Sequence, residues 1–325
     1  MRALITGISG FAGSHLAEYL LSHTDWHVTG TVYGPDSNVA HLKDKVTLYP
    51  ADLSQREVVR HLLKETRPDC VFHLAAQPSA ALSRHDPWFT LENNIRVQLN
   101  ILDGMAQAGL TSRVLVVGSG DEYGLVTPDD LPIDEETPLR PTTPYAVSKV
   151  TQDYLGLQYF LSHGVAAIRV RPFNHIGARQ RQGFVAADFA SQIAEIEAGL
   201  RPPEVRVGTL DVSRDLTDVR DIVRGYYLAL TQGEPGEVYN LGSERENTTR
   251  ALLETLISLA MLDVRIVQDP GLLRPSDVPR IVADCRKVRA RTGWRAEIPF
   301  EQSLRDLLDY WRGQVAVKGR CKTGN

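Results

Sequence analysis

The feature that most constrains the fold is a glycine-rich turn between a short apolar stretch and an amphipathic segment. Its glycines are Gly7, Gly10 and Gly13, in the spacing G-x-x-G-x-x-G, with Phe11 and Ala12 between the last two. Glycines let the backbone turn tightly and approach a pyrophosphate, whose charge the N-terminus of the next helix can hold. An ordinary strand–turn–helix with packing glycines fits the same letters. Because the motif joins a strand to a helix, it predicts a dinucleotide site that includes all five residues.

After this motif, short apolar runs alternate with segments of helical periodicity. The apolar runs span residues 27–33, 46–49, 70–76, 113–117 and 165–171, and the helical segments span 54–65, 93–108 and 144–161. Strands that alternate with helices indicate a parallel sheet covered on both faces, which is the Rossmann-type doubly wound α/β class. In such a sheet, ligands bind beyond the carboxyl ends of the strands.

The alternation loosens after the last of these runs, where we expect a smaller lobe to begin. We predict a dinucleotide-binding domain over residues 1–171, joined by about residues 218–241. Residues 172–217 and 242–312 would then form a discontinuous substrate-binding lobe with helices at 184–198 and 301–312. The polar, aperiodic segment 313–325 is expected to be a disordered tail.

Two further strand ends carry residues suited to a bound dinucleotide. Asp52 and Leu53 follow the predicted third strand, and the Asp52 carboxylate could accept a hydrogen bond from an adenine amino group. The alternative role for Asp52 is a helix N-cap, and both roles are compatible. Leu74, Ala75 and Ala76 follow the fourth strand, where small side chains leave room for a cofactor.

The second strand leaves the choice between NAD and NADP open. An acidic residue at the end of this strand often binds the adenine ribose, whereas a nearby Arg favours a 2′-phosphate. Here the strand ends at Tyr33-Gly34-Pro35, which contains neither residue type. The expected cofactor is therefore NADP or NAD.

A tyrosine, a lysine and a serine form the candidate catalytic set. Tyr145 and Lys149 are four residues apart in a predicted helix and therefore share one face. An ammonium group near a phenol favours the phenolate, which predicts a lowered pKa for Tyr145 and proton exchange near neutral pH. Ser119 ends the predicted fifth strand, and its hydroxyl could bond the same substrate oxygen. The Y-x-x-x-K pattern is common by chance, so its meaning depends on the glycine motif.

Composition excludes several other classes of protein. The 325 residues are 42% hydrophobic and 23% charged, with a net charge of −4 and no basic tract, which argues against a nucleic-acid-binding protein. No apolar run is long enough to span a membrane, and no signal peptide is expected. Cys70, Cys285 and Cys321 lack paired spacing, which predicts a cytoplasmic protein without disulfides or a metal site.

Taken together, these motifs resemble the extended short-chain dehydrogenase/reductase family over residues 1–312. The similar motifs are Gly7-x-x-Gly10-x-x-Gly13, Asp52-Leu53, His73-Leu-Ala-Ala, Ser119, Tyr145-x-x-x-Lys149 and Arg171-Pro-Phe-Asn. The resemblance implies a nicotinamide cofactor, Tyr145 as proton donor or acceptor, Lys149 on the nicotinamide ribose and Ser119 on the substrate oxygen. It also implies a homodimer through helices near 93–108 and 144–161.

Within that family, the chain is most similar to the branch that acts on GDP-mannose derivatives. The residues that this likeness places on a nucleotide sugar are Asn174, Val185, Asp188, Arg214, Arg274 and Asp277. Arg214 and Arg274 suit a diphosphate, because a guanidinium can clamp two oxygens, although most arginines form surface ion pairs. Asn174 offers a donor and an acceptor to hydroxyl groups, and Asp188 could accept from a guanine edge.

This branch implies two activities that share most of their residues. One is NAD(P)H-dependent reduction of the C4 keto group of GDP-4-dehydro-6-deoxy-D-mannose to give GDP-D-rhamnose. The other is 4,6-dehydration of GDP-mannose, which needs an additional base; relatives supply a Glu where this chain has Asp121, one methylene shorter. The adjacent Glu122 should point elsewhere. A misplaced base can cost about a hundredfold in rate, so the reductase is favoured.

Other functions remain open at this stage. A different nucleotide-sugar epimerase or dehydratase would share the same motifs, and phosphate-binding arginines do not read the base. A non-catalytic dinucleotide-binding protein is the third class, and the intact Ser119, Tyr145 and Lys149 argue against it. The stereochemistry at C4 also stays open.

Overall fold

A seven-stranded parallel sheet forms the centre of the molecule. The computed structural model describes residues 1–273 and 279–323, so Arg274 and Asp277 lie outside the described residues. The strand order is β10-β6-β5-β4-β1-β2-β3, and every neighbouring pair is parallel. The strands are β1 (Arg2–Thr6), β2 (His27–Val32), β3 (Thr47–Pro50), β4 (Cys70–His73), β5 (Arg113–Val117), β6 (Ala166–Pro172) and β10 (Val238–Leu241). The predicted doubly wound α/β class is confirmed.

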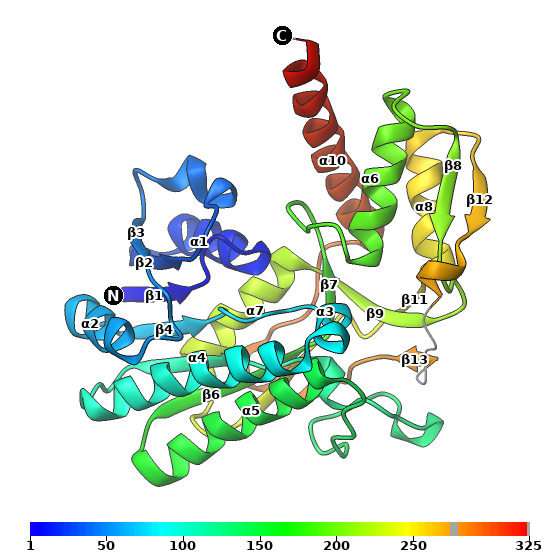
Figure 1. Cartoon of the computed structure of the whole chain (residues 1–325). Helices are drawn as coiled ribbons and strands as arrows, with labels where there is room; N and C mark the ends of the chain where they lie inside the picture. The colour runs from blue at the N-terminus through cyan, green and yellow to red at the C-terminus, as the bar shows by residue number, and fades with distance from the viewer. Residues whose placement is uncertain (274–278, 324–325) are drawn as a thin grey trace.

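Helices cover both faces of this sheet (Figure 1). Successive strand residues point to opposite faces, so Ile5 packs in one apolar cluster and Leu4 in the other. The cluster around Ile5 includes Leu16 and Tyr226, from α1 and α7, whereas the cluster around Leu4 includes Ile101. On the face of Ile5 lie α1 (Phe11–His23), α7 (Val219–Gln232) and α9 (Arg286–Thr292). On the face of Leu4 lie α2 (Arg56–Thr66), α4 (Pro87–Gln107) and α5 (Pro144–His163).

A third apolar cluster lies apart from the sheet, among helices drawn toward the upper right of Figure 1. Its helices are α6 (Val185–Glu197), α8 (Thr249–Ala260) and α10 (Phe300–Thr323), beside the paired strands β8 (Glu204–Val207) and β12 (Arg265–Gln268). A small sheet joins β7 (Asn174–Ile176), β9 (Ser213–Asp218), β11 (Glu246–Thr248) and β13 (Arg280–Ile281). The proposed boundaries between the two lobes stay a prediction.

The prediction of a disordered tail from residue 313 is wrong for the described part of that segment. Helix α10 continues through residue 323. Its apolar stripe, formed by Leu304, Leu308, Trp311 and Val315, packs in the third cluster, and Val315 is only 6% exposed. Val315 continues the helical spacing of this stripe into the segment that is polar on average. Its burial therefore favours a helix beyond residue 313.

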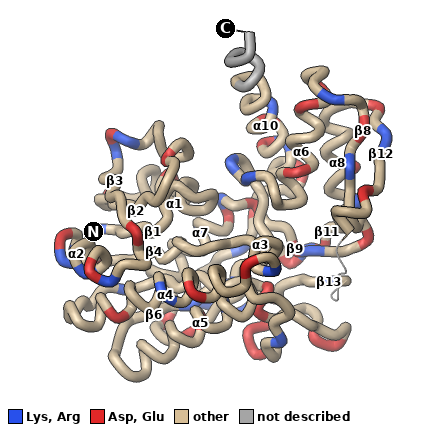
Figure 2. The backbone as a smooth tube through the Cα atoms, viewed as in Figure 1, with Lys and Arg blue, Asp and Glu red and all other residues tan. Residues whose placement is uncertain are grey.

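Positively and negatively charged residues are interspersed along the chain (Figure 2). The most informative ion pair joins the two halves of the molecule: Arg179, just after β7, binds both carboxylate oxygens of Glu18 in α1, at 2.6 and 2.7 Å. This fork-shaped pair fixes the segment after β7 against the helix that follows the glycine turn. Within the described residues, no helix combines the length and apolarity needed to cross a bilayer.

Candidate active site

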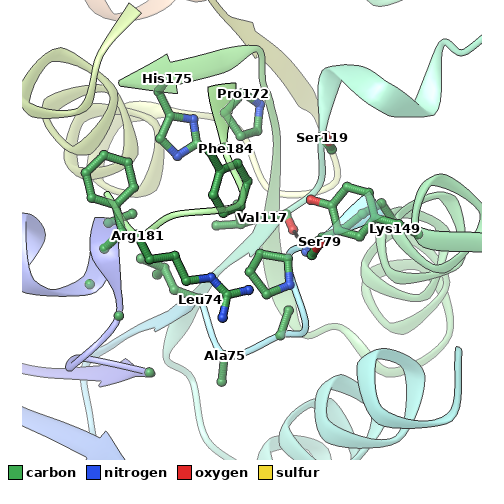
Figure 3. Close-up of a pocket in the computed structure, with 18 of the residues that line it drawn as sticks. Leu74, Ala75, Ser79, Val117, Ser119, Lys149, Pro172, His175, Arg181 and Phe184 are labelled. Atoms are coloured by element: carbon green, nitrogen blue, oxygen red, sulfur yellow. Dashed lines mark hydrogen bonds between the residues drawn. The ribbon is translucent and has the colours of Figure 1, made fainter. Parts of the chain in front are cut away.

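One large cavity of about 1400 Å³ lies beyond the carboxyl ends of the central strands. In Figure 3 the labelled lining residues come from the segment after β4, the end of β5, α5, the end of β6, β7 and the segment after β7. All of the predicted cofactor and catalytic residues line it, together with two of the predicted substrate residues: Gly7, Gly10, Phe11, Ala12, Gly13, Asp52, Leu53, Leu74, Ala75, Ala76, Ser119, Asp121, Tyr145, Lys149, Asn174 and Val185. The fold thus gathers these residues in one place, while their individual roles stay predictions.

The glycine turn forms one end of the cavity. Gly7 has φ +70°, a left-handed conformation that favours glycine, and its N–H donates to Thr31 Oγ1 at 3.1 Å. A Cβ on Gly13 would lie 2.9 Å from Ile8 Cα and still closer to the Gly7 carbonyl. Helix α1 starts after Gly10 without a side-chain cap, so its first N–H groups can receive an anion.

The end of β4 is fixed by a buried residue that the motif search did not single out. Thr6 Oγ1 accepts hydrogen bonds from the N–H groups of Leu74 and Ala75, both at 3.1 Å, and lies 2.9 Å from His73 Nδ1. Burial lowers the pKa of His73 to about 3, so this histidine is neutral. Thr6 therefore holds the small-residue segment beside the glycine turn.

Asp52 organises its own loop and does not cap the following helix. Helix α2 begins at Arg56 with Gln55 as its N-cap. The Asp52 carboxylate accepts from Ser54 N and Oγ, at 3.0 and 2.7 Å, and from Gln55 Nε2 at 3.1 Å. The Ser54 hydroxyl is the largest cause that lowers the pKa of Asp52, so the residue is an anion on the cavity wall.

Ser119 lies where β5 ends and the short turn η2 (Gly120–Glu122) begins. Its N–H donates to Glu122 Oε1 at 2.8 Å, and its Oγ accepts from the N–H of Asp121 at 3.1 Å. Glu122 points away from the cavity lining, as predicted. Burial raises the pKa of Asp121, and the nearby Arg214 and Arg84 oppose this rise.

Tyr145 occupies the first turn of α5, which Thr143 caps by accepting from the N–H of Ala146 at 3.0 Å. The expectation of a lowered Tyr145 pKa is wrong for this structure. Burial raises the pKa of the phenol and the Asp121 carboxylate raises it further, while a hydrogen bond with Ser119 opposes the change. Tyr145 is therefore a protonated phenol that meets Ser119 in the cavity.

The side chain of Lys149 is hydrogen-bonded to the central sheet. Its ammonium donates to the Val117 carbonyl at 2.9 Å and lies 6.0 Å from the centre of the Tyr145 ring. This contact with β5 explains why Lys149 does not dominate the pKa of the phenol. Burial lowers the pKa of Lys149 to about 8, so the amine is still charged at neutral pH.

The predicted substrate residues divide between the cavity and its surroundings. Asn174 and Val185 line the cavity, but Asp188 and Arg214 do not. The Asp188 carboxylate accepts from the N–H of Gly183 at 2.7 Å, and Arg214 donates to the Ser213 carbonyl at 2.7 Å. Their predicted contacts with a nucleotide sugar remain untested.

Arg181 is a cation that sequence reasoning missed. It lines the cavity, lies over the Phe184 ring at 5.9 Å, and extends its guanidinium into the cavity (Figure 3). The family likeness drew attention to the nearby Val185, but nothing in the sequence spacing marked Arg181. A guanidinium in this position can bind phosphate oxygens.

Comparison with known proteins places the chain among nucleotide-sugar enzymes. The model of the family described as GDP-mannose 4,6 dehydratase matches residues 4–307. The chain is 38% identical over 315 residues to the GDP-6-deoxy-D-mannose reductase of Pseudomonas aeruginosa, covering 97% of this chain and 98% of that protein. It is 28% identical to GDP-mannose 4,6 dehydratase 2 of Arabidopsis thaliana, over 94% of this chain and 86% of that protein.

Solved structures agree with these relatives. The structure of RMD from Pseudomonas aeruginosa complexed with NADPH has a TM-score of 0.86 and 37% identity, over 96% of this chain and 99% of that one. A UDP-glucose 4-epimerase from Thermus thermophilus in complex with NAD has a TM-score of 0.84 and 30% identity, over 96% and 99% of the two chains. With its glycine turn, parallel sheet and gathered Ser119, Tyr145 and Lys149, the chain belongs to the GDP-mannose 4,6 dehydratase family of extended short-chain dehydrogenases/reductases.

Proposed function

We propose that the protein is an NAD(P)H-dependent reductase of GDP-4-dehydro-6-deoxy-D-mannose, with GDP-D-rhamnose as its product. The observation that carries this proposal is the 38% identity with GDP-6-deoxy-D-mannose reductase along nearly the whole of both chains. NAD(P)H is the cofactor, since solved relatives hold NADPH and NAD. The glycine turn and the uncapped N-terminus of α1 fit its pyrophosphate.

The state of Tyr145 suits the reductive direction. When bound, NAD(P)H supplies the hydride to the C4 carbonyl carbon. Tyr145 gives its proton to the carbonyl oxygen as charge develops there, and its raised pKa keeps that proton in place beforehand. Ser119 donates a hydrogen bond to the same oxygen. The Lys149 ammonium, charged near neutral pH, holds the ribose and replaces the proton that the phenol loses.

On the substrate side, the diphosphate of the GDP-sugar needs cations within the cavity. Arg181 meets this need, because its guanidinium extends into the cavity over Phe184. Arg214 adds positive charge near Asp121. Asn174, at the start of β7, binds sugar hydroxyls.

The second candidate is the GDP-mannose 4,6-dehydratase, which the family model and the 28% identical plant enzyme favour. That reaction needs a base to remove the C5 proton, and Asp121 is the carboxylate on the cavity wall. Its side chain is one methylene shorter than that of a Glu, which would place the carboxylate farther from the C5 proton.

Two assays and one variant separate these activities. We expect NADPH oxidation with the 4-keto GDP-sugar, and no keto product from GDP-mannose with NADP. Asp121→Asn should keep most reductase turnover, with a loss well below the roughly 100-fold minimum typical of removing a general base. A keto product from GDP-mannose that disappears in Asp121→Asn would identify a dehydratase instead.

A homodimer through α4 and α5 completes the proposal. The two helices pack side by side, with Asn94 donating to Ser148 Oγ at 2.9 Å. On α5, the exposed residues Val147, Tyr154 and Leu161 recur every seven positions, with Leu161 71% exposed. Such an apolar stripe on one helix face is typical of an interface.

The oligomeric state can be measured directly. We expect sedimentation equilibrium to give twice the mass of the chain and Leu161→Glu to shift this value toward the monomer, because the new charge would be buried. The matched control is Leu200→Glu, since Leu200 is also exposed (61%) but lies beyond α6, in the other half of the molecule. A monomeric wild type would contradict the interface.

We place the enzyme in the cytoplasm, where the unpaired Cys70 and Cys285 would stay reduced.

A further inference from the structure

Glu122 is a fully buried carboxyl group directly behind the predicted catalytic serine. It ends the turn η2 after β5, and none of its surface is exposed (0%). Its Oε1 accepts the N–H of Ser119 at 2.8 Å, a group that the sheet no longer satisfies because β5 has ended. A Cβ on Gly118 would collide with this oxygen, so the carboxyl group lies tightly against the backbone. Glu122 therefore fixes the position from which Ser119 reaches the cavity.

The other carboxyl oxygen of Glu122 faces a buried ion-pair network. Its Oε2 lies 3.2 Å from Arg171 Nε, which donates to Asp153 Oδ2 at 2.7 Å. Asp153 Oδ1 also accepts from Arg169 Nη1 at 2.5 Å. All four side chains are buried, and both arginines come from β6. Glu122 is thus the member of this network that contacts the serine turn.

The same network begins on the catalytic helix. Asp153 follows Lys149 by four residues and Tyr145 by eight, so the three side chains occupy one face of α5. A path of direct contacts therefore runs from α5, through Asp153 and Glu122, to the backbone of Ser119. It sets the spacing between the serine hydroxyl and the phenol independently of substrate.

The contacts around Glu122 favour a proton on its carboxyl group. Arg171 Nε has one hydrogen, which Asp153 receives at the shorter distance. Within the described part of the chain, no group donates a hydrogen bond to Glu122 Oε2. The group with which Glu122 can share a hydrogen bond is the Asp153 carboxylate, which can only accept. Burial and the charge of Asp153 raise the pKa of Glu122 well above its usual range. A proton on Oε2 turns the repulsion between two acids into a hydrogen bond.

We propose that neutral Glu122 is a positioning residue, which holds Ser119 against Tyr145 by accepting from the Ser119 N–H and donating to Asp153. This role rests on the proposed reduction, in which Ser119 and Tyr145 act on the same oxygen. A carboxylic acid offers one acceptor and one donor, and both are used here. An ionised Glu122 would lose the donor, and its negative charge would help to raise the pKa of the Tyr145 phenol.

Two substitutions at this position test the proposal. Glu122→Gln keeps an acceptor for Ser119 and a donor for Asp153, so kcat should stay within about tenfold of the wild type. Glu122→Leu has a similar volume but neither group, and we expect kcat to fall by about 100-fold, as for a misplaced catalytic group, with KM for NADPH little changed. The matched control is Glu135→Leu, because Glu135 binds the N–H of Asn240 at 2.7 Å on the far side of Arg171. It should lose thermal stability and keep kcat.

Hydrogen exchange of the peptide that contains Ser119 gives a readout that needs no substrate. Glu122→Leu should expose the Ser119 amide to exchange, whereas Glu122→Gln and Glu135→Leu should leave its protection at the wild-type level. Full kcat in Glu122→Leu would overturn the proposal, and so would a Glu122→Gln enzyme as slow as Glu122→Leu. If the wild type does not reduce the 4-keto sugar, the proposed function fails, and the exchange pattern alone still decides whether Glu122 holds the serine turn.

Discussion

Tyr145→Phe should lower kcat for reduction of the 4-keto sugar by about 10²–10⁴-fold, the contribution typical of a positioned general acid. The substitution removes one oxygen and leaves a ring of nearly the same shape in the first turn of α5. The phenol hydroxyl is proposed to act in the proton-transfer step rather than in binding. The dissociation constants of NADPH and the GDP-sugar should therefore stay close to wild type. Stopped-flow NADPH oxidation gives kcat, and calorimetric titration gives both affinities.

The pH profile of the wild type supplies the control for this experiment. Burial lowers the pKa of Lys149 to about 8, so its ammonium is present below that pH and is lost above it. We expect kcat/KM to decline through pH 8 with one proton lost. Tyr145→Phe should keep the same alkaline limb at its lower rate. An active Tyr145→Phe enzyme would mean that another group donates the proton.

Gly13→Ala should reduce NADPH affinity by at least tenfold, which corresponds to about 1.4 kcal/mol. The added Cβ would lie 2.9 Å from Ile8 Cα and would collide with the Gly7 carbonyl, so backbone rather than a flexible side chain has to move. The glycine turn must then open at the point where a pyrophosphate would approach it. Overpacking of this kind also destabilises a fold by about 1–3 kcal/mol. Fluorescence titration with NADPH and thermal unfolding measure the two effects.

Gly313→Ala is the matched control for this substitution. Gly313 lies in α10, its added Cβ would meet nothing within 4 Å, and no positive φ constrains it. The exposed helix should gain up to about 1 kcal/mol, with NADPH affinity unchanged. Wild-type affinity in Gly13→Ala would show that the close approach of α1 to the glycine turn does not matter for the cofactor.

The sequence predicted the parts of this molecule that depend on local patterns. The strand–glycine–helix order and the alternation of apolar runs follow from short-range spacing, and the doubly wound sheet is confirmed. The gathering of Ser119 and Tyr145 follows from the rule that parallel strands end at one edge. These features need no knowledge of how distant segments pack.

What the sequence could not predict depends on neighbours that are distant along the chain. The pKa of Tyr145 moves upward because burial and Asp121 outweigh the hydrogen bond with Ser119, while Lys149 bonds to the Val117 carbonyl. Arg181 enters the cavity because of the course of the loop after β7, which no motif records. The length of α10 depends on a partner surface for Val315, since polar composition alone favoured a tail.

The position of β10 at the edge of the central sheet has a consequence for how the polypeptide folds during its synthesis. This strand pairs with β6 and follows α7, yet α7 and β10 both come after the segments that build part of the third apolar cluster. A nascent chain that has emerged only as far as β6 would expose the unpaired edge of that strand and the sheet face that α7 later shields. The nucleotide-binding half therefore cannot reach its final form during synthesis until about seventy more residues have left the ribosome, which links its completion to residues of the other half.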